Sequence, residues 1–265
     1  MPMTRPLPEI SQYALSRFDR CGRLFELGHL QRTTWPAPDP MDENVEAKRR
    51  LAVGDMFHRL VQWHARGLEV APLLEVLAAA DGAEELRRQW DAYLASPYAT
   101  PGAACWTEQT LRVTVDGLRL LVRYDRLERG EDGRWTIFDW KTGRGFEPDS
   151  AARSWQTRLY RLALAKGGHR FNGGAPIAPE AVTVVYWHVP SGEAHAFPYD
   201  SALLTQDEQA LAAVADRLQT GLTDGFEPNE RHCDRCVYRS RCQIDVERPA
   251  IAAAPMVWPT FKFPD

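Results

Sequence analysis

The chain has 265 residues, of which 44% are hydrophobic and 26% charged, and this composition is that of an ordinary globular protein with one large domain. No apolar stretch approaches the roughly 18 residues that a membrane helix needs. The N-terminal "MPMTRPLPEI" lacks the apolar segment of a signal peptide, so we expect a cytoplasmic protein. The formal net charge of −4 neither favours nor excludes a nucleic-acid partner.

Helical periodicity dominates the first hundred residues. The stretch "SQYALSRFDRCGRLFELGHL" predicts one helix, or two short helices with a break near Gly22. A second helix is predicted over residues 42–66, with Asp42 as its N-cap, and a third over 83–95. We therefore expect residues 1–100 to form a helical part of the domain.

After Pro101 the sequence changes to the alternation that is typical of strands. Two Asp-Gly dipeptides separate three predicted antiparallel strands, at about 107–115, 118–128 and 134–141. Two further helices and two further strands are predicted at 151–165 (helix), 181–189 (strand), 193–199 (strand) and 202–219 (helix). This order predicts an α/β domain with a central mixed β-sheet flanked by helices.

We expect the whole chain, residues 1–265, to be one domain. Its sheet core should occupy residues 101–200, and residues 201–247 should add a helix and a cysteine-rich segment. The Pro-punctuated residues 248–265 are expected to form a tail on the surface or a disordered tail.

The stretch "FDWK" places an acid and a lysine at the end of the third predicted strand. Facing residues in an antiparallel hairpin have a constant sum of numbers, and a turn at 131–133 makes that sum about 264. Asp125 is therefore expected opposite Asp139, and Lys141 shares the face of Asp139 because side chains alternate with a period of two. Two carboxylates this close favour a Mg²⁺ or Mn²⁺ site, and the lysine suits metal-assisted hydrolysis of a phosphodiester. A surface salt-bridge patch is the alternative.

Four motifs in this order resemble the PD-(D/E)XK nuclease superfamily, in particular its RecB-like exonuclease branch and the iron–sulfur nucleases of CRISPR adaptation. They are "GDMFH", "VRYDRL", "FDWKTG" and "QTRLY", and they span residues 54–160. The resemblance implies a restriction-endonuclease-like core that cleaves DNA with Mg²⁺ or Mn²⁺. Trp140 stands where the family usually has Tyr or Phe.

The resemblance also implies roles for individual residues in these motifs. The implied metal ligands are His58, Asp125, Asp139 and the main-chain carbonyl of Trp140. The implied catalytic residues are Asp125, Asp139, Lys141, Gln156 and Tyr160, of which the last two position the substrate backbone or support the lysine. A structural histidine at 58 and a helix face that only packs on the sheet at 156 and 160 are the alternatives. Glu108 is an additional acid, because in relatives an acid at the start of the first strand can approach the metal site.

Three of the five cysteines lie in "HCDRCVYRSRC", at Cys233, Cys236 and Cys242. An odd count in a presumed cytoplasmic protein argues against a disulfide framework, and a thiolate metal site usually has four ligands. Cys21 lies in "SRFDRCGRLFEL", which resembles the N-terminal segment of the iron–sulfur nucleases and implies that Cys21 completes a [4Fe–4S] cluster. Zn²⁺ with the same ligands and unligated thiols are the alternatives, and Cys105 is expected to be a free thiol.

We therefore expect a metal-dependent DNA nuclease, acting as an exonuclease on single-stranded DNA or on DNA with single-stranded ends, in repair, recombination or CRISPR adaptation. Because the chain lacks a Walker A motif, a helicase or a CRISPR-adaptation protein is the expected partner. The alternatives are a non-cleaving nucleic-acid-binding or scaffold subunit with the same fold, and an enzyme that acts on RNA.

Overall fold

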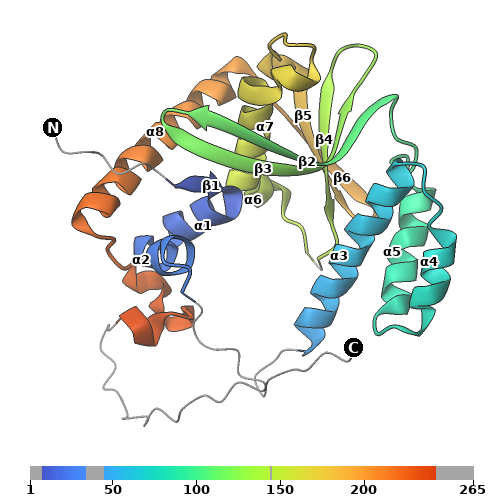
Figure 1. Ribbon diagram of the computed structural model, residues 1–265, viewed down its shortest axis with the longest axis horizontal. Coiled ribbons are helices and arrows are strands. Elements are labelled where there is room, and N and C mark those ends of the chain that lie inside the picture. Colours follow the sequence, from blue (N-terminus) through green and yellow to red (C-terminus); the bar gives the residue numbers. More distant parts are fainter. Residues whose placement is uncertain (1–7, 34–44, 144, 243–265) are drawn as a thin grey trace, which may run out of the picture.

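A mixed β-sheet of six strands forms the centre of the computed structural model, which describes residues 8–33, 45–143 and 145–242 (Figure 1). The strands are β1 (Glu9–Ser11), β2 (Ala104–Val115), β3 (Leu118–Arg129), β4 (Trp135–Lys141), β5 (Val182–His188) and β6 (Glu193–Pro198). β2, β3 and β4 form an antiparallel meander, and β5 joins β4 in parallel. β6 returns antiparallel to β5, and the short β1 pairs with β3 in parallel.

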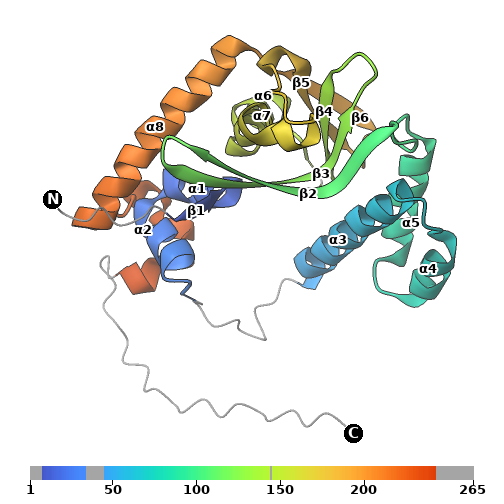
Figure 2. The same cartoon turned by 45° about the horizontal axis from the view of Figure 1, so that its top comes forward.

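Helices pack on both faces of this sheet and also lie at both of its ends. The α-helices are α1 (Gln12–Arg20), α2 (Gly22–Phe25), α3 (Val45–Ala65), α4 (Ala71–Val76), α5 (Ala83–Ala95), α6 (Pro148–Arg153), α7 (Trp155–Gly167) and α8 (Ser201–Asp224). A π-helical turn, Glu26–Leu30, follows α2. Near the C-terminal end of the described residues, Cys233 and Cys242 lie in the 3₁₀ turns Glu230–Arg235 and Arg239–Cys242, and Cys236 lies between these turns. Figure 2 shows α8 and the group α3 to α5 at opposite ends of the sheet. None of the described helices has the length and apolar character needed to cross a bilayer.

The sheet separates two hydrophobic cores, and the alternation along β4 shows how. Trp135 and Ile137 belong to the core that α1, α7 and α8 share with β3 and β5. Phe138 and Trp140 belong to the core on the other face, which α3, α4 and α5 cover. Since side chains on a strand alternate between faces, Asp139 is directed towards α7 and Trp140 towards α3 and α5.

The predicted mixed α/β architecture is confirmed, and most strands agree with the prediction to within a few residues. The predicted helix over 151–165 is two helices, because Ser154 has an extended backbone and caps α7 by accepting a hydrogen bond from the backbone N–H of Thr157. β1 and α4 were not predicted, since three and six residues carry too little periodicity to be recognised. The predicted N-cap Asp42 and the tail 248–265 lie outside the described residues.

A buried ion pair joins α7 to α8. The carboxylate of Asp207, which is 3% exposed, accepts a hydrogen bond from Arg158 Nε at 2.6 Å and another from the Tyr199 hydroxyl at 3.1 Å. Its second oxygen lies 3.9 Å from a guanidinium nitrogen of Arg161, itself a buried residue. Removing one member of such a group costs far more than an exposed pair contributes, because the other charges stay buried without compensation.

We therefore expect Asp207→Ala to lower the free energy of unfolding by about 3–5 kcal/mol, measured by urea denaturation. The matched control is Glu208→Ala, the next residue of α8, whose half-exposed pair with Lys166 should contribute less than about 1 kcal/mol. Equal losses in the two variants would show that Asp207 does not stabilise the contact between the helices.

Candidate metal and catalytic site

The candidate site lies where two strands on one edge of β3 diverge. On this edge β1 pairs with Arg119–Leu121 and β4 with Arg126–Arg129. In the described part of the chain, residues 122–125 have no strand partner on this edge. The gap leaves room for the side chains of Asp125 and its neighbours at the centre of the sheet.

The register of the β3–β4 hairpin brings the two predicted acids together. The last pair of the ladder is Arg126 with Phe138, so facing residue numbers sum to 264, as expected from the sequence, and Asp125 and Asp139 are the next residues along their strands. One oxygen of the Asp125 carboxylate accepts a hydrogen bond of 2.9 Å from the backbone N–H of Trp140. The acid is thereby fixed to the neighbouring strand before any ligand binds.

The helix α3 brings His58 to the same carboxylate. His58 Nδ1 lies 3.2 Å from Asp125 Oδ2. Four residues earlier, Gly54 lies directly against the strand end, because a Cβ atom there would be 2.8 Å from Thr142 Oγ1. Gly54, the first residue of the "GDMFH" motif, thus permits the close approach of α3 to the end of β4. This approach places His58, the last residue of the motif, beside Asp125.

The helix α7 supplies a hydrogen-bond network around the second acid. Lys141 Nζ lies 2.7 Å from Asp139 Oδ2 and donates to Gln156 Oε1 at 2.7 Å. The amide nitrogen of Gln156 donates to Asp139 Oδ1 at 2.7 Å and lies 3.0 Å from the Tyr160 hydroxyl. The Tyr160 hydroxyl donates to the same Asp139 oxygen at 3.2 Å. Gln156 therefore contacts both the lysine and the acid, and Tyr160 contacts the acid. Their role in catalysis stays a prediction.

Burial and like charge set the protonation of these groups. Burial raises the pKa of Asp139 to about 6, the Asp125 carboxylate adds to this, and Lys141 opposes it. Burial lowers the pKa of His58, but the negative charges of Asp125, Asp139 and Glu108 outweigh burial and raise it to about 9. The protein without a divalent cation therefore holds a protonated histidine among three carboxylates.

Glu108 contributes more to this cluster than the sequence indicated. One ligand atom from each of His58, Glu108 and Asp125 lies within 4.8 Å of the other two, an arrangement that could hold a metal ion. Glu108 has a left-handed backbone with φ of 51°, uncommon for a residue with a side chain, and Arg123 Nε lies 3.2 Å from its carboxylate. Burial and then the Asp125 charge raise its pKa. A left-handed residue inside a strand leaves no signature in the sequence, which is why Glu108 could only be suggested.

All seven residues assigned by the motifs line one cavity of about 650 Å³, together with Glu108. Its remaining lining residues are Gln12, Asp55, Arg59, Gln62 and Arg123. Trp140 reaches the cavity through its backbone, because its ring packs into the core on the other face, 4.9 Å beneath the Arg126 guanidinium. The ligand role of the Trp140 carbonyl stays a prediction.

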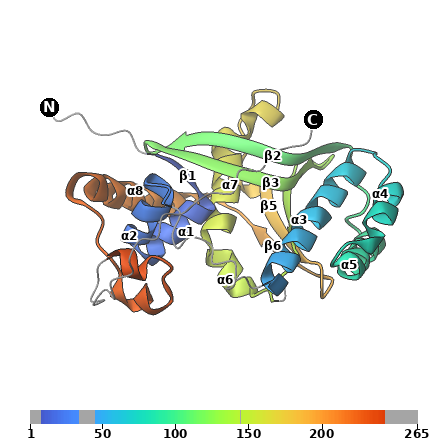
Figure 3. The same cartoon turned by 60° about the horizontal axis from the view of Figure 1, so that its bottom comes forward.

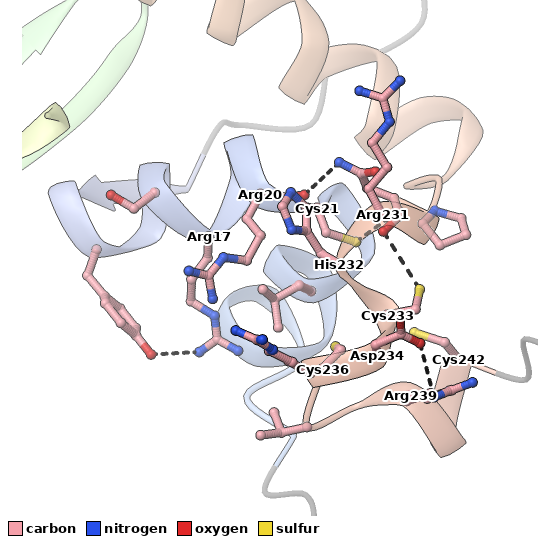
Figure 4. Close-up of a pocket in the computed structure, with 17 residues that line it drawn as sticks. Arg17, Arg20, Cys21, Arg231, His232, Cys233, Asp234, Cys236, Arg239 and Cys242 are labelled. Carbon is pink, nitrogen blue, oxygen red and sulfur yellow. Dashed lines mark hydrogen bonds and ion pairs between the residues drawn. The ribbon is translucent and has the colours of Figure 1, made fainter. Parts of the chain in front are cut away.

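The cysteines gather at a second cavity, of about 720 Å³ (Figure 4). Cys21 lies between α1 and α2, and the C-terminal segment contributes Cys233, Cys236 and Cys242. All five cysteines are free thiols, and Cys105 lies apart from the other four, on β2. Among the described residues, no three of the cysteine sulfurs lie as close together as the ligand atoms of the His58 cluster.

The backbone and the burial around these thiols suit a ligand set. The N–H of Asn229 donates to the sulfur of Cys21 at 3.3 Å, which links the junction of α1 and α2 to the segment after α8. Burial and then the neighbouring cysteines raise the pKa of Cys233 and Cys242, because thiolates so close repel one another. A bound cation would offset that repulsion.

The comparison with protein families places the chain in a nuclease superfamily. The sequence matches the PD-(D/E)XK nuclease superfamily over residues 9–243. The crystal structure of a candidate exonuclease from Eubacterium rectale has a TM-score of 0.54 at 10% identity, covering 91% of this chain and 90% of that chain. The crystal structure of SSO0001 has a TM-score of 0.35 at 16% identity, covering 72% of this chain and 84% of that chain, a likeness too weak to carry an argument. No curated protein matches the sequence.

The match to the superfamily runs from β1 to just beyond the last described residue, so it includes both cavities. At 10% identity, the likeness to the Eubacterium rectale protein shows a common fold and nothing finer. The broad resemblance expected from the four motifs is confirmed by the family match, which covers far more than half of the sequence. The chain belongs to the PD-(D/E)XK nuclease superfamily.

Proposed function

We propose that this protein is a Mg²⁺- or Mn²⁺-dependent deoxyribonuclease that hydrolyses phosphodiester bonds as an exonuclease. The observation that carries this proposal is the convergence of His58, Asp125, Asp139 and Lys141 on one cavity. The four side chains come from three separate elements, α3, β3 and β4. A salt-bridge patch on the surface would not need a buried acid whose pKa is raised to about 6.

The donor set fits a hard divalent cation. Carboxylate oxygens with one imidazole nitrogen suit Mg²⁺ and Mn²⁺, and the raised pKa values of Asp139 and Glu108 reflect negative charge that such a cation would neutralise. We propose that His58, Asp125, Asp139 and the Trp140 carbonyl hold the ion, with Glu108 as a further ligand. When bound, the ion would polarise the scissile phosphate and acidify a water molecule.

The side chains around this position would then divide the remaining tasks. We assign to Lys141 the stabilisation of negative charge on the phosphate, or the orientation of the attacking water, since its ammonium group faces the cavity beside Asp139. Gln156 holds the lysine and the acid at a fixed separation, because its amide bonds both. Tyr160 supports Asp139 from the other side.

We further propose that Cys21, Cys233, Cys236 and Cys242 hold a [4Fe–4S] cluster. The support is the chemistry of the donor set, four thiols on one cavity, with a backbone N–H directed at one sulfur. The cluster would be structural, since it would tie the junction of α1 and α2 to the segment after α8. Zn²⁺ on the same ligands is the alternative.

The motif order and the cysteine spacing support a finer placement among RecB-like nucleases, with a role in DNA repair, recombination or CRISPR adaptation. We propose that a helicase or a CRISPR-adaptation protein supplies any strand separation. The rival is a non-cleaving nucleic-acid-binding subunit with the same fold. A complete set of histidine, acids and lysine in one cavity favours cleavage, because binding alone does not require it.

Lys141→Ala should fold and bind DNA but lose at least about 100-fold in cleavage rate, the usual effect of removing one group that stabilises transition-state charge. Cleavage is measured on end-labelled single- and double-stranded DNA in Mg²⁺ and in Mn²⁺. Lys166→Ala, on the exposed side of α7, is the control and should cleave like the wild type. Wild-type rates for Lys141→Ala would remove this lysine from the chemistry.

The free energy of unfolding of the metal-free protein should fall as pH rises from about 6.5 to about 9. The pKa of His58 is raised from 6.5 to about 9 in the folded protein, so its stabilising charge is complete below pH 6.5 and is lost as pH passes 9. The loss should be on the order of 3 kcal/mol. It is measured in EDTA as the difference between the wild type and His58→Ala. A difference that does not change with pH would contradict the proposed charge cluster.

Protein purified without oxygen should contain iron and inorganic sulfide and absorb in the visible range. Serine substitution of Cys21, Cys233, Cys236 or Cys242 should abolish the iron, whereas Cys105→Ser should retain it, because Cys105 lies apart from the second cavity. Zinc in place of iron would support the alternative metal. Full iron content in the Cys21→Ser protein would show that the fourth ligand is another group.

A further inference from the structure

Both cavities have a lining residue in the first turn of α1. Gln12 lines the catalytic cavity, and the next residue, Tyr13, lines the cavity of the cysteines. Figures 1 and 3 show α1 between the C-terminal cysteine segment and the strands of the catalytic site. A ligand longer than the catalytic cavity could therefore continue over Tyr13 onto the surface beyond.

That surface has the opposite charge to the protein as a whole. Five arginines and a single acid, Asp234, line the second cavity, although the formal net charge of the chain is −4. These arginines, hereafter the arginine surface, are Arg17, Arg20, Arg231, Arg235 and Arg239. Arg239 forms an ion pair with Asp234 at 3.3 Å, whereas within the described ranges Arg20, Arg231 and Arg235 are exposed and have no acidic partner.

Exposed apolar side chains accompany this charge. Tyr13 is 65% exposed and Val237 57% exposed, and both line the same cavity as the arginine surface. The Arg17 guanidinium lies 5.3 Å from the ring centroid of Tyr13 and 5.7 Å from that of the buried Tyr238, and it donates to the Tyr13 hydroxyl at 3.2 Å. Arg17 thus holds in place an aromatic ring that is largely exposed.

We infer that the arginine surface and Tyr13 bind the single-stranded part of the DNA whose end lies in the catalytic cavity. This inference rests on the proposed nuclease function and names its substrate class. The arginines would contact phosphates, and the Tyr13 ring would stack on a base. The exposed ring favours a single strand, because the bases of a duplex are stacked on one another and cannot reach it.

The first test is binding of fluorescein-labelled single-stranded DNA in EDTA, measured by fluorescence anisotropy and therefore independent of cleavage. Tyr13→Ala should weaken binding about fivefold or more, the effect usual for the loss of one stacked base. Tyr13→Phe keeps the ring and should bind like the wild type. A duplex of the same sequence should be affected by neither substitution.

The second test is the salt dependence of the same binding. The slope of log K against log salt is about −0.7 for each phosphate contact to a single strand, so the triple variant R20A/R231A/R235A should reduce its magnitude by about 2. The control R87A/R88A/R134A removes the same charge from exposed positions on α5 and the β3–β4 turn, and should leave the slope unchanged.

Unchanged single-strand affinity in Tyr13→Ala, or equal slopes for the two triple variants, would overturn the inference. Equal weakening of duplex and single-strand binding by Tyr13→Ala would also overturn it. These results are separate from the proposed nuclease function. A Tyr13→Ala protein that binds single-stranded DNA weakly and has a raised KM but an unchanged kcat would support both the inference and the proposed nuclease function. Normal binding by a wild-type protein that cleaves nothing would remove only the nuclease function.

Discussion

The repulsion between the half-buried carboxylate of Asp125 and the buried carboxylate of Asp139 is the constraint on which the site depends. The hairpin of β3 and β4 places them on neighbouring strands just beyond its last paired residues, and the Trp140 N–H holds the Asp125 carboxylate there. Positively charged side chains must therefore lie close to these two carboxylates to offset their repulsion. α3 contributes His58 and β4 contributes Lys141, while α7 adds neutral hydrogen-bond donors. The convergence of these elements on one cavity follows from the need to offset this charge.

Local rules explain which parts of this arrangement could be predicted from the sequence. The facing of Asp125 and Asp139 followed from a turn and a constant register, and the shared face of Lys141 followed from strand alternation. The contact of His58 with Asp125 joins residues 67 positions apart, so only the resemblance to a family suggested it. The place of Glu108 depends on a backbone φ of 51°, which no residue pattern encodes.

Gly54 shows that a residue's role can depend on tertiary packing that the sequence pattern does not reveal. In the sequence, Gly54 is a helix residue of low propensity. In the structure it is the point where α3 lies against Thr142, and it sets the distance between His58 and the strand. The cysteines show the same dependence on long-range contacts, because Cys21 approaches the C-terminal segment only through the packing of α1, where Asn229 donates to its sulfur. The arginine surface is likewise assembled from α1 and the segment after α8.

The central claim is that one divalent cation binds between the acids of β3 and β4. The most direct measurement is anomalous X-ray diffraction from crystals of this protein soaked in Mn²⁺. The account predicts an anomalous peak about 2.0–2.3 Å from carboxylate oxygens of Asp125 and Asp139 and from a ring nitrogen of His58. A fully occupied Mn²⁺ bound elsewhere, with these three side chains at the distances found without metal, would contradict it.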